Sequence, residues 1–343
     1  MTNVSKPLIE ALRGKRIDPP PIWLMRQAGR YLPEYRRIRE SAGGFLNLCY
    51  NSEKATEVTL QPIRRFGLDA AILFSDILVV PHALGQHVTF EIGVGPKLKP
   101  IRDTKSLSAL SLDGLHDGLG QVYATVEKVA QQLPDRVALI GFAGAPWTVA
   151  TYMIEGGASR DFQNAKGWAL ANPDKFQSLI DLLTVATSAY LIRQADAGAD
   201  AIQLFDTWAG VLPTYAFRRF CADPIREIAR QVKKFHPNIP IIAFPKGVPL
   251  SLPDLVKTPE VDAIGIDYSI DPAWAARELQ PHAVIQGNFD PTLLLAGGRE
   301  LERGAKDIVH TFSKGPHIFN LGHGILPQTP VKHVEQLIAT VRA

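Results

Sequence analysis

Cysteine is scarce in this chain of 343 residues, which contains only Cys49 and Cys221. This number rules out a disulfide framework, and neither cysteine belongs to a pair or cluster with the spacing of zinc ligands. The nine histidines are scattered and show no metal spacing either. We therefore expect no metal, and a reducing location, for which the cytoplasm fits best.

An excess of one charge sign is also missing, because 37 Lys and Arg residues face 34 Asp and Glu residues. The net charge of +3 is too small for a protein whose partners are nucleic acid or anionic lipid. No apolar run approaches the ~18 residues that a membrane-spanning helix needs. The segment 1–21 carries Glu10 and Asp18 and lacks a continuous apolar stretch, so we expect neither a secretory nor a transit peptide.

The composition, by contrast, is that of an ordinary globular protein, with 46% hydrophobic and 21% charged residues. It excludes disorder, collagen and a coiled coil, while the length alone allows one or two domains. Short apolar runs recur along the whole chain, and their continuous apolar character is typical of strands in a covered parallel sheet. There are eight of these runs: Ile22–Arg26, Ala70–Asp76, Val137–Gly144, Ala201–Asp206, Pro240–Pro245, Ala263–Tyr268, Val284–Asn288 and His317–Gly322.

Segments of helical period separate these runs. Ser52 is expected to cap a helix that ends at Phe66, and Pro173 to open one that ends at Ala195. Gly67 and Gly198 fall where a left-handed residue would end these helices, and Pro213 and Pro330 lie near two further helix starts. The interval 77–136 is too long for one crossover, so it predicts a β-hairpin (Val88–Ile92 and Lys97–Ile101) and a helix over Leu115–Gln132.

Eight strands alternating with helices favour a single (β/α)8 barrel over residues 1–343, with this hairpin and helix inserted after the second strand. An open doubly wound sheet is the alternative. It usually has fewer strands, and its dinucleotide-binding form is weakened by the lack of a Gly-x-Gly-x-x-Gly motif after the first run.

Polar residues stand at the carboxyl ends of the expected strands, where a barrel of this kind has its active site. Arg26 ends the first run, with Gln27 and Arg30 behind it, and Asp76 ends the second. The later runs lead into Thr148, Asp206-Thr207, Lys246, Asp267-Tyr268, Asn288 with Asp290, and Asn320 with His323. Guanidinium groups bind carboxylates or phosphates through two hydrogen bonds, and Gly29 allows close backbone approach to a ligand.

Each of these residues also has a structural interpretation. Arg36, Arg37 and Arg39 are expected on the solvated surface, unlike Arg26 and Arg30. Asp76 follows an apolar strand and needs a partner, which is either a ligand or a structural ion pair. Tyr152 either reaches the cavity at the barrel mouth or fills the core. His323 is either accessible between its glycines or a core residue whose hydrogen bonds are satisfied inside the protein. Together the set suits a polyanionic substrate with a hydrogen-bond-donor core, handled without a cofactor.

Two long segments carry a family resemblance, and three short ones extend it. Residues 21–36 (PIWLMRQAGRYLPEYR) and 141–156 (GFAGAPWTVATYMIEG) resemble the two signature segments of the uroporphyrinogen decarboxylases. The resemblance continues through Phe74–Leu78, Phe205–Gly210 and Asn320–Gly324, so it covers essentially the whole chain.

The resemblance implies a (β/α)8 barrel, a homodimer, and a carboxy-lyase that works without a cofactor on uroporphyrinogen III. The four acetate side chains become methyl groups, giving coproporphyrinogen III in haem and chlorophyll synthesis. The implied substrate site comprises Arg26, Gln27, Ala28, Gly29, Arg30, Asp76, Tyr152, Thr207 and His323. Asp76, Arg26, Tyr152 and His323 are the implied catalytic residues, with Thr207 where the family often has serine. Arg26 is a candidate proton donor, although its high pKa makes it a poor acid.

Two other functions use similar features. The zinc-dependent corrinoid or cobamide methyltransferases share this type of fold, but need a His-x-Cys pair and a distant second cysteine, and neither Cys49 nor Cys221 has that context. A non-catalytic tetrapyrrole carrier would keep the arginines without needing an acid. Release of CO2 or of partly decarboxylated products distinguishes an enzyme from a carrier.

Overall fold

Seven parallel strands form the central sheet of the computed structural model, which describes residues 5–91 and 93–343. The strands follow one another in chain order around the sheet, as expected when each is joined to the next by a helix. They are β1 (Ala70–Ile72), β4 (Ala138–Gly144), β5 (Ala201–Asp206), β6 (Ile241–Pro245), β7 (Ala263–Gly265), β8 (Val284–Gln286) and β9 (His317–Ile318). This is an α/β barrel of the expected class.

The segment around Ile22 closes the ring between β9 and β1. Ile22 forms a parallel bridge with Phe319, and the Phe319 N–H donates to the Pro21 carbonyl over 2.9 Å. On the other side, the Asp69 N–H donates to the Ile22 carbonyl, and the Ile22 N–H donates to the Asp69 carboxylate. The expected strand Ile22–Arg26 is therefore reduced to a single bridge. The chain leaves the wall in a turn, in which the Gln27 N–H donates to the Leu24 carbonyl and Arg26 has a φ of +61°, outside the extended region.

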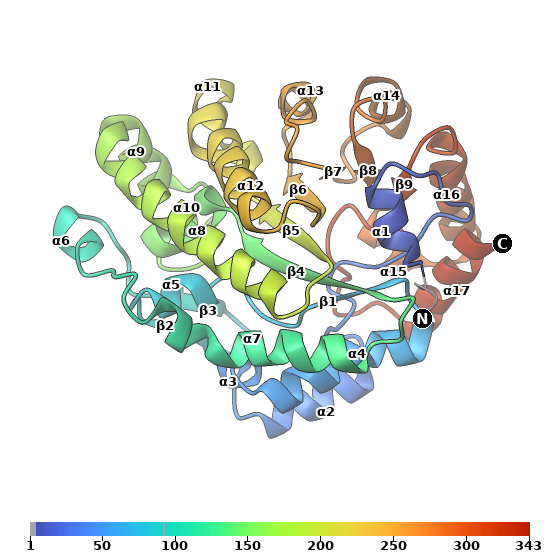
Figure 1. Cartoon of the computed structure of the whole chain (residues 1–343), viewed down its shortest axis with the longest axis horizontal. Helices are drawn as coiled ribbons and strands as arrows, with labels where there is room; N and C mark the ends of the chain where they lie inside the picture. Colours follow the sequence, from blue (N-terminus) through green and yellow to red (C-terminus); the bar gives the residue numbers. More distant parts are fainter. Residues whose placement is uncertain (1–4, 92) are drawn as a thin grey trace.

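Helices cover the outside of the strands (Figure 1). Neighbours pack in pairs, with α4 against α7, α10 against α12, and α16 against α17. The longer helices are α2 (Pro33–Ser41), α4 (Ser52–Phe66), α7 (Leu115–Gln132), α8 (Pro146–Glu155), α9 (Gln163–Ala171), α10 (Pro173–Asp196), α12 (Asp223–Phe235), α14 (Pro272–Glu278), α16 (Gly298–Thr311) and α17 (Val331–Arg342). The shorter ones are α1 (Pro7–Leu12), α3 (Phe45–Cys49), α5 (Val79–Ala83), α6 (Thr104–Leu107), α11 (Thr214–Phe217), α13 (Leu252–Leu255) and α15 (Pro291–Ala296), with helical turns at Ala209–Val211, Arg218–Ala222 and Pro249–Ser251.

The buried apolar residues form two layers. One lies between the strands and the helices, and the other fills the inside of the barrel. The inner layer includes Leu8 and Leu12 of α1 beside Ala70 and Ala138 at the starts of their strands. Lys6, just before α1, pairs with Asp200, just before β5. Helix α1 therefore seals the amino-terminal end of the barrel and leaves the opposite end for chemistry.

The insertion after β1 contains the expected hairpin, formed by β2 (Val88–Glu91) and β3 (Gly95–Leu98) in antiparallel pairing. Ile92, expected in its first strand, lies outside the described residues. The Leu98 N–H donates to the Gly156 carbonyl and the Ile101 N–H to the Met153 carbonyl. The insertion therefore braces the carboxyl end of α8.

Helix ends agree with the expectations in part. Gly67 ends α4 with a φ of +62°, and α7 has the predicted bounds. The predicted cap Ser52 is wrong, because the Asn51 side chain accepts the Lys54 N–H and Ser52 is the first helical residue. No helix within the described ranges combines the length and the apolar character needed to cross a membrane.

Candidate active site

Arg26 stands at the point where the chain leaves the barrel wall. Its backbone conformation is rare for a residue with a side chain, and such strain is commonly held at functional sites. The preceding residue is fixed, since the Met25 N–H donates to the Asn320 side chain and the Met25 carbonyl accepts the Ile325 N–H. The Arg26 side chain lies against Gly324, where a Cβ atom would stand 2.3 Å from Arg26 Cδ. Arg26 is thus held at the β9 side of the barrel mouth.

The turn over residues 26–30 is shaped by Gln27, which is 1% exposed. Its side-chain oxygen accepts the Leu24 N–H, its amide donates to the Ala70 carbonyl, and its own carbonyl accepts the Tyr31 hydroxyl. The implied binding residue Gln27 therefore has its side chain engaged inside the protein. A Cβ on Gly29 would lie 2.8 Å from the Arg26 carbonyl oxygen, so this tight turn requires glycine.

Two kinds of unengaged donor point out of this turn. The Ala28, Gly29 and Arg30 N–H groups have no protein acceptor within residues 5–91 and 93–343. The side chains of Arg26 and Arg30 are exposed, and neither forms an ion pair within those ranges. Arg36 braces the turn by donating to the Arg30 and Tyr31 carbonyls. A turn with free amides and two unpaired guanidinium groups is suited to binding carboxylates.

The Asp76 carboxyl follows β1 and faces this cationic turn. Its Oδ1 atom accepts the Leu78 N–H over 2.9 Å, and no ion pair of Asp76 is found in the described part of the chain. The side chain is partly accessible, although protein atoms surround it densely enough that burial raises its pKa to about 6. The Leu78 hydrogen bond and the Arg26 charge oppose this shift. The geometry gives no support to the structural ion pair.

Tyr152 and His323 approach the same place from α8 and from the loop after β9. Burial raises the pKa of the Tyr152 phenol, and the charges of Asp76 and Arg26 also act on it, so it lies near both. Burial, together with the Arg26 and Lys246 charges, lowers the pKa of His323 to about 4. At neutral pH both groups are therefore uncharged hydrogen-bond donors.

Thr207 follows β5 directly and is half-buried. The next residue, Trp208, has its ring centre 6.5 Å from that of Tyr152. Arg26, Arg30, Asp76, Tyr152, Thr207 and His323 thus all belong to the carboxyl ends of strands, or to the turns and helices that follow them.

Asp206 is a residue whose role the sequence did not reveal. It is fully buried, and its Oδ1 atom accepts hydrogen bonds from the N–H and the hydroxyl of Thr148 at the start of α8. The Thr148 hydroxyl in turn accepts the Trp208 N–H. Asp206 therefore fixes α8, which carries Tyr152, against the loop that carries Thr207. The signal in the sequence that could have indicated this role is a single aspartate at the end of an apolar strand.

Two expectations about individual side chains need correction or detail. Arg39 is not on the solvated surface: it is half-buried, stacks over the Phe45 ring at 5.0 Å and donates to the Tyr35 hydroxyl. Cys49 and Cys221 are both buried, and burial raises the pKa of each thiol. Within residues 5–91 and 93–343, no group of three or more His, Cys, Asp and Glu side chains is placed to share a metal ion.

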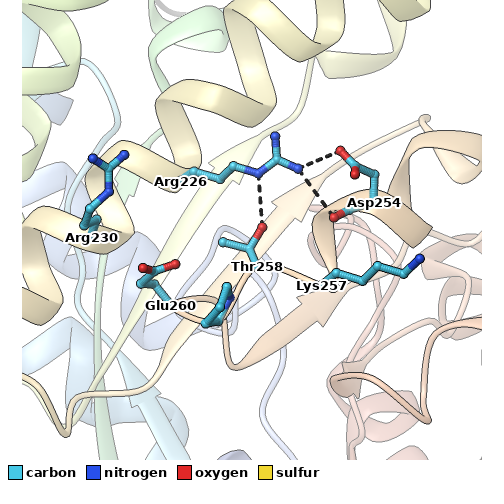
Figure 2. A pocket seen from close by; sticks show the side chains of 7 residues that line it. Arg226, Arg230, Asp254, Lys257, Thr258 and Glu260 are labelled. Carbon is cyan, nitrogen blue, oxygen red and sulfur yellow. Dashed lines mark hydrogen bonds and ion pairs between the residues drawn. The ribbon is translucent and has the colours of Figure 1, made fainter.

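A separate surface pocket lies on the outer wall, between α12 and the segment leading to β7 (Figure 2). Its central side chain, Arg226, is paired with Asp254 and also donates to the Thr258 hydroxyl. Arg230, Lys257, Pro259 and Glu260 also line it. None of the expected site residues lines this pocket, so it is distinct from the barrel mouth.

Comparison with known proteins identifies the family of the chain. The model of the family described as uroporphyrinogen decarboxylase (URO-D) matches residues 3–343. Among curated relatives, a uroporphyrinogen decarboxylase of Rhodospirillum rubrum is 53% identical over 342 residues, covering 100% of this chain and 98% of the relative. One of Chelativorans sp. is 52% identical over 335 residues, covering 98% and 97%.

Solved structures support the fold. A methyltransferase from Methanosarcina mazei superposes with a TM-score of 0.81 at 20% identity, covering 99% of this chain and 98% of that one. A B12-independent methionine synthase from Shewanella sp. gives a TM-score of 0.56 at 9% identity, covering 84% and 85%. At such identities the likeness extends to the fold alone. The family model and the curated relatives, in contrast, match over nearly the whole length, and the chain belongs to the uroporphyrinogen decarboxylase family.

Proposed function

We propose that this chain removes CO2 from the four acetate side chains of uroporphyrinogen III and releases coproporphyrinogen III. It is a carboxy-lyase, and the proposed reaction uses no cofactor. The observation that carries the proposal concerns residues 5–91 and 93–343. Within them, Arg26 and Arg30 have no carboxylate partner, and the Asp76 carboxylate beside them has no ion-pair partner. A substrate with carboxylates at its rim and N–H donors at its centre complements both.

The chemistry needs an electron sink, because a carbanion at an acetate CH2 group is too costly to form. Protonation of the pyrrole α-carbon supplies this sink as a cation. The bond between the CH2 carbon and the carboxylate then breaks, its electron pair enters the ring, and CO2 leaves. The resulting exocyclic methylene takes up a proton to become a methyl group, while the α-carbon loses its added proton and the ring becomes aromatic again. One proton is consumed for each CO2 released.

The site residues have distinct roles in this proposal. The Asp76 carboxylate accepts pyrrole N–H hydrogen bonds and stabilises the positive charge of the intermediate. Arg26 and Arg30, with the free amides of Ala28 and Gly29, hold acetate and propionate carboxylates. Gln27 shapes the turn that presents them. The neutral Tyr152, His323 and Thr207 side chains donate hydrogen bonds to oxygen atoms of the substrate or position the proton that is transferred.

We also propose that residues 1–343 form one catalytic domain, which acts as a homodimer in the cytoplasm. The exposed side chains of Tyr215, Leu250 and Tyr268, in the segments that follow β5, β6 and β7, support a self-association surface around the barrel mouth. Analytical ultracentrifugation of the purified chain measures its mass in solution. A monomer at micromolar concentration would contradict the dimer.

The proposed activity is tested by anaerobic incubation of the protein with chemically reduced uroporphyrinogen III. After oxidation of the products, chromatography should resolve a ladder from eight carboxyl groups down to four, with matching release of CO2. The same ladder should appear in the presence of a strong chelator. If no product with fewer carboxyl groups forms, the proposed function is wrong, and loss of turnover that only an added divalent ion restores would contradict the cofactor-free mechanism.

The Arg26→Lys variant should lower kcat/KM at least about tenfold, because lysine keeps the charge but loses the planar pair of donors that grips a carboxylate. The control is Arg37→Lys on the exposed side of α2, which should retain wild-type turnover. Steady-state kinetics on both variants provide the measurement. Equal effects of the two changes would remove Arg26 from the proposed site.

The pH profile should report the protonation of Asp76. Since burial raises its pKa to about 6, kcat/KM should fall about tenfold per unit as the pH drops below 6, where the neutral carboxyl no longer stabilises a cation. The charged group acting on it is Arg26, and Tyr152 and Cys49 stay protonated in this range. His323, with a pKa of about 4, adds no change near pH 6.5.

A control is needed because burial also raises the pKa of Asp206 to about 6. The Asp206→Asn variant should keep the acidic fall in kcat/KM, even if its overall rate is lower. A profile that becomes flat in this variant would assign the titration to Asp206 instead of Asp76.

A further inference from the structure

Lys246 is a cation at the barrel mouth to which the proposed roles assign nothing. It directly follows β6, and the order of strands places β6 across the ring from the segment that carries Arg26. In one direction β1, β4 and β5 lie between the two, and in the other β9, β8 and β7. Lys246 and Arg26 therefore stand on opposite sides of the same opening.

The backbone of Lys246 is held firmly in this place. Its N–H donates to the Asp206 carbonyl over 3.1 Å, and its carbonyl accepts the Gly210 N–H over 2.9 Å. The following Gly247 N–H donates to Asp267 Oδ2 over 2.8 Å. A Cβ at Gly210 would lie 2.7 Å from the Gly247 carbonyl oxygen, so the loops after β5 and β6 are in direct contact. The base of the lysine side chain is thus positioned by both neighbouring strands.

The ammonium group of Lys246 has no anionic partner within residues 5–91 and 93–343. The neighbouring carboxylate of Asp267 is already engaged, because Oδ2 accepts the Gly247 N–H and Oδ1 accepts the Ser269 N–H and hydroxyl. Lys246 Nζ lies instead 5.7 Å from the centre of the Tyr268 ring. A half-buried cation that lacks a counter-charge favours the binding of an anion.

Three other half-buried lysines, among them Lys128 and Lys233, have acidic partners, whereas Lys54 and Lys166 form no ion pair within the described residues. Lys128 contacts Glu53, and Lys233 lies 2.9 Å from Asp262. Lys246 also differs from them in facing the site, since its charge and that of Arg26 both lower the pKa of His323. The cation is therefore close enough to the site to act on a ligand bound there.

Resting on the proposed function, we propose that Lys246 binds a carboxylate of the porphyrinogen on the side opposite to Arg26 and Arg30. The macrocycle carries carboxylates around its whole rim, so a site with cations at one edge alone leaves the far edge unmatched. Lysine is a point charge on a flexible stem, which follows acetate and propionate groups of different reach. This suits a substrate whose four pyrrole rings react one after another and which loses one carboxylate at each step.

The test uses Lys246→Met, which removes the charge and keeps the length, and Lys246→Arg, which keeps the charge. The control is Lys257→Met in the outer-wall pocket (Figure 2), where an exposed lysine lies far from the mouth. Lys246→Met should raise KM for uroporphyrinogen III about tenfold at low ionic strength with a smaller change in kcat. The defect should shrink as salt is added, Lys246→Arg should restore most of the affinity, and Lys257→Met should match the wild type.

A binding measurement separates this inference from the proposed function. The oxidised octacarboxylate uroporphyrin does not react, and its affinity is read from quenching of tryptophan fluorescence. Lys246→Met should raise its Kd by a similar factor. The inference would be overturned if Lys246→Met had the same KM and Kd as the Lys257→Met control. It would also be overturned if Lys246→Arg were as impaired as Lys246→Met. A wild-type protein that binds uroporphyrin but releases no CO2 from uroporphyrinogen III would overturn the proposed function instead.

Discussion

The Asp76→Asn variant should lose at least ~10²-fold in turnover while remaining folded. Asparagine has nearly the same size and can still accept the Leu78 N–H through its amide oxygen. It lacks the negative charge opposite the pyrrole cation, and its NH2 group faces substrate N–H donors with another donor. Purified protein is compared with the wild type for decarboxylated product and for unfolding in urea.

The free energy of unfolding of Asp76→Asn should not fall below that of the wild type, because the ionised Asp76 carboxylate is less favourable in the folded chain than in the unfolded one. Burial raises its pKa from 3.8 to about 6, so at pH 7 ionisation lowers the free energy of unfolding, and asparagine removes this effect. At pH 7 the variant should therefore have a larger free energy of unfolding than the wild type. This difference should shrink as the pH falls through 6, since the carboxyl of the folded wild type then becomes neutral. A folded variant with a near-normal rate would remove Asp76 from the mechanism.

Replacing Gly322 with alanine should lower stability, whereas replacing Gly324 with alanine should lower activity, although the two glycines belong to one loop. At Gly322 the new Cβ would lie 2.2 Å from the Tyr268 backbone nitrogen and 2.9 Å from the Asp267 carbonyl carbon. Backbone atoms cannot move aside without shifting the loop after β7. We expect Gly322→Ala to lower the free energy of unfolding by about 3 kcal/mol or more.

At Gly324 the new Cβ would meet the Arg26 side chain, 2.3 Å from Cδ and 2.9 Å from Nε. A flexible side chain can swing away, so the free energy of unfolding should change by less than about 1 kcal/mol. The displaced guanidinium group, however, should cost at least about tenfold in kcat/KM. Urea titration and steady-state kinetics on both variants separate the effects, and full activity of Gly324→Ala would contradict the assigned position of Arg26.

The sequence predicted the barrel because its strands are buried on both faces and read as continuous apolar runs. Seven runs correspond to strands, including Ala201–Asp206 with the predicted bounds. Others are shorter, as in β1, which ends at Ile72 before the chain bends toward Asp76. The run at Ile22 has the same composition but forms one bridge. There the chain leaves the wall in a turn at residues 24–27, which includes the left-handed Arg26 and which no local pattern indicates.

Sequence reasoning selected the residues that we propose for the site, but it could not supply their electrostatics. Position at strand ends was enough to select Arg26 and Asp76, since all parallel strands end at one face. The raised pKa of Asp76 and the lowered pKa of His323 depend on packing by distant segments, so the sequence could not supply them. Arg39 was misplaced for the same reason: its contacts with Phe45 and Tyr35 come from tertiary packing. The engagement of the Gln27 side chain was likewise invisible.

The seam at Ile22 and Phe319 joins residues from opposite ends of the chain, and the site straddles it. Arg26 lies on one side, against Gly324 on the other. During synthesis Arg26 leaves the ribosome about 300 residues before His323 and Gly324. Contacts of such long range form late in folding, because closing the intervening loop carries an entropic penalty that earlier, more local contacts do not. A nascent chain that still lacks His323 cannot bring it together with Arg26, so binding of porphyrinogen at the proposed site would report that this seam has closed.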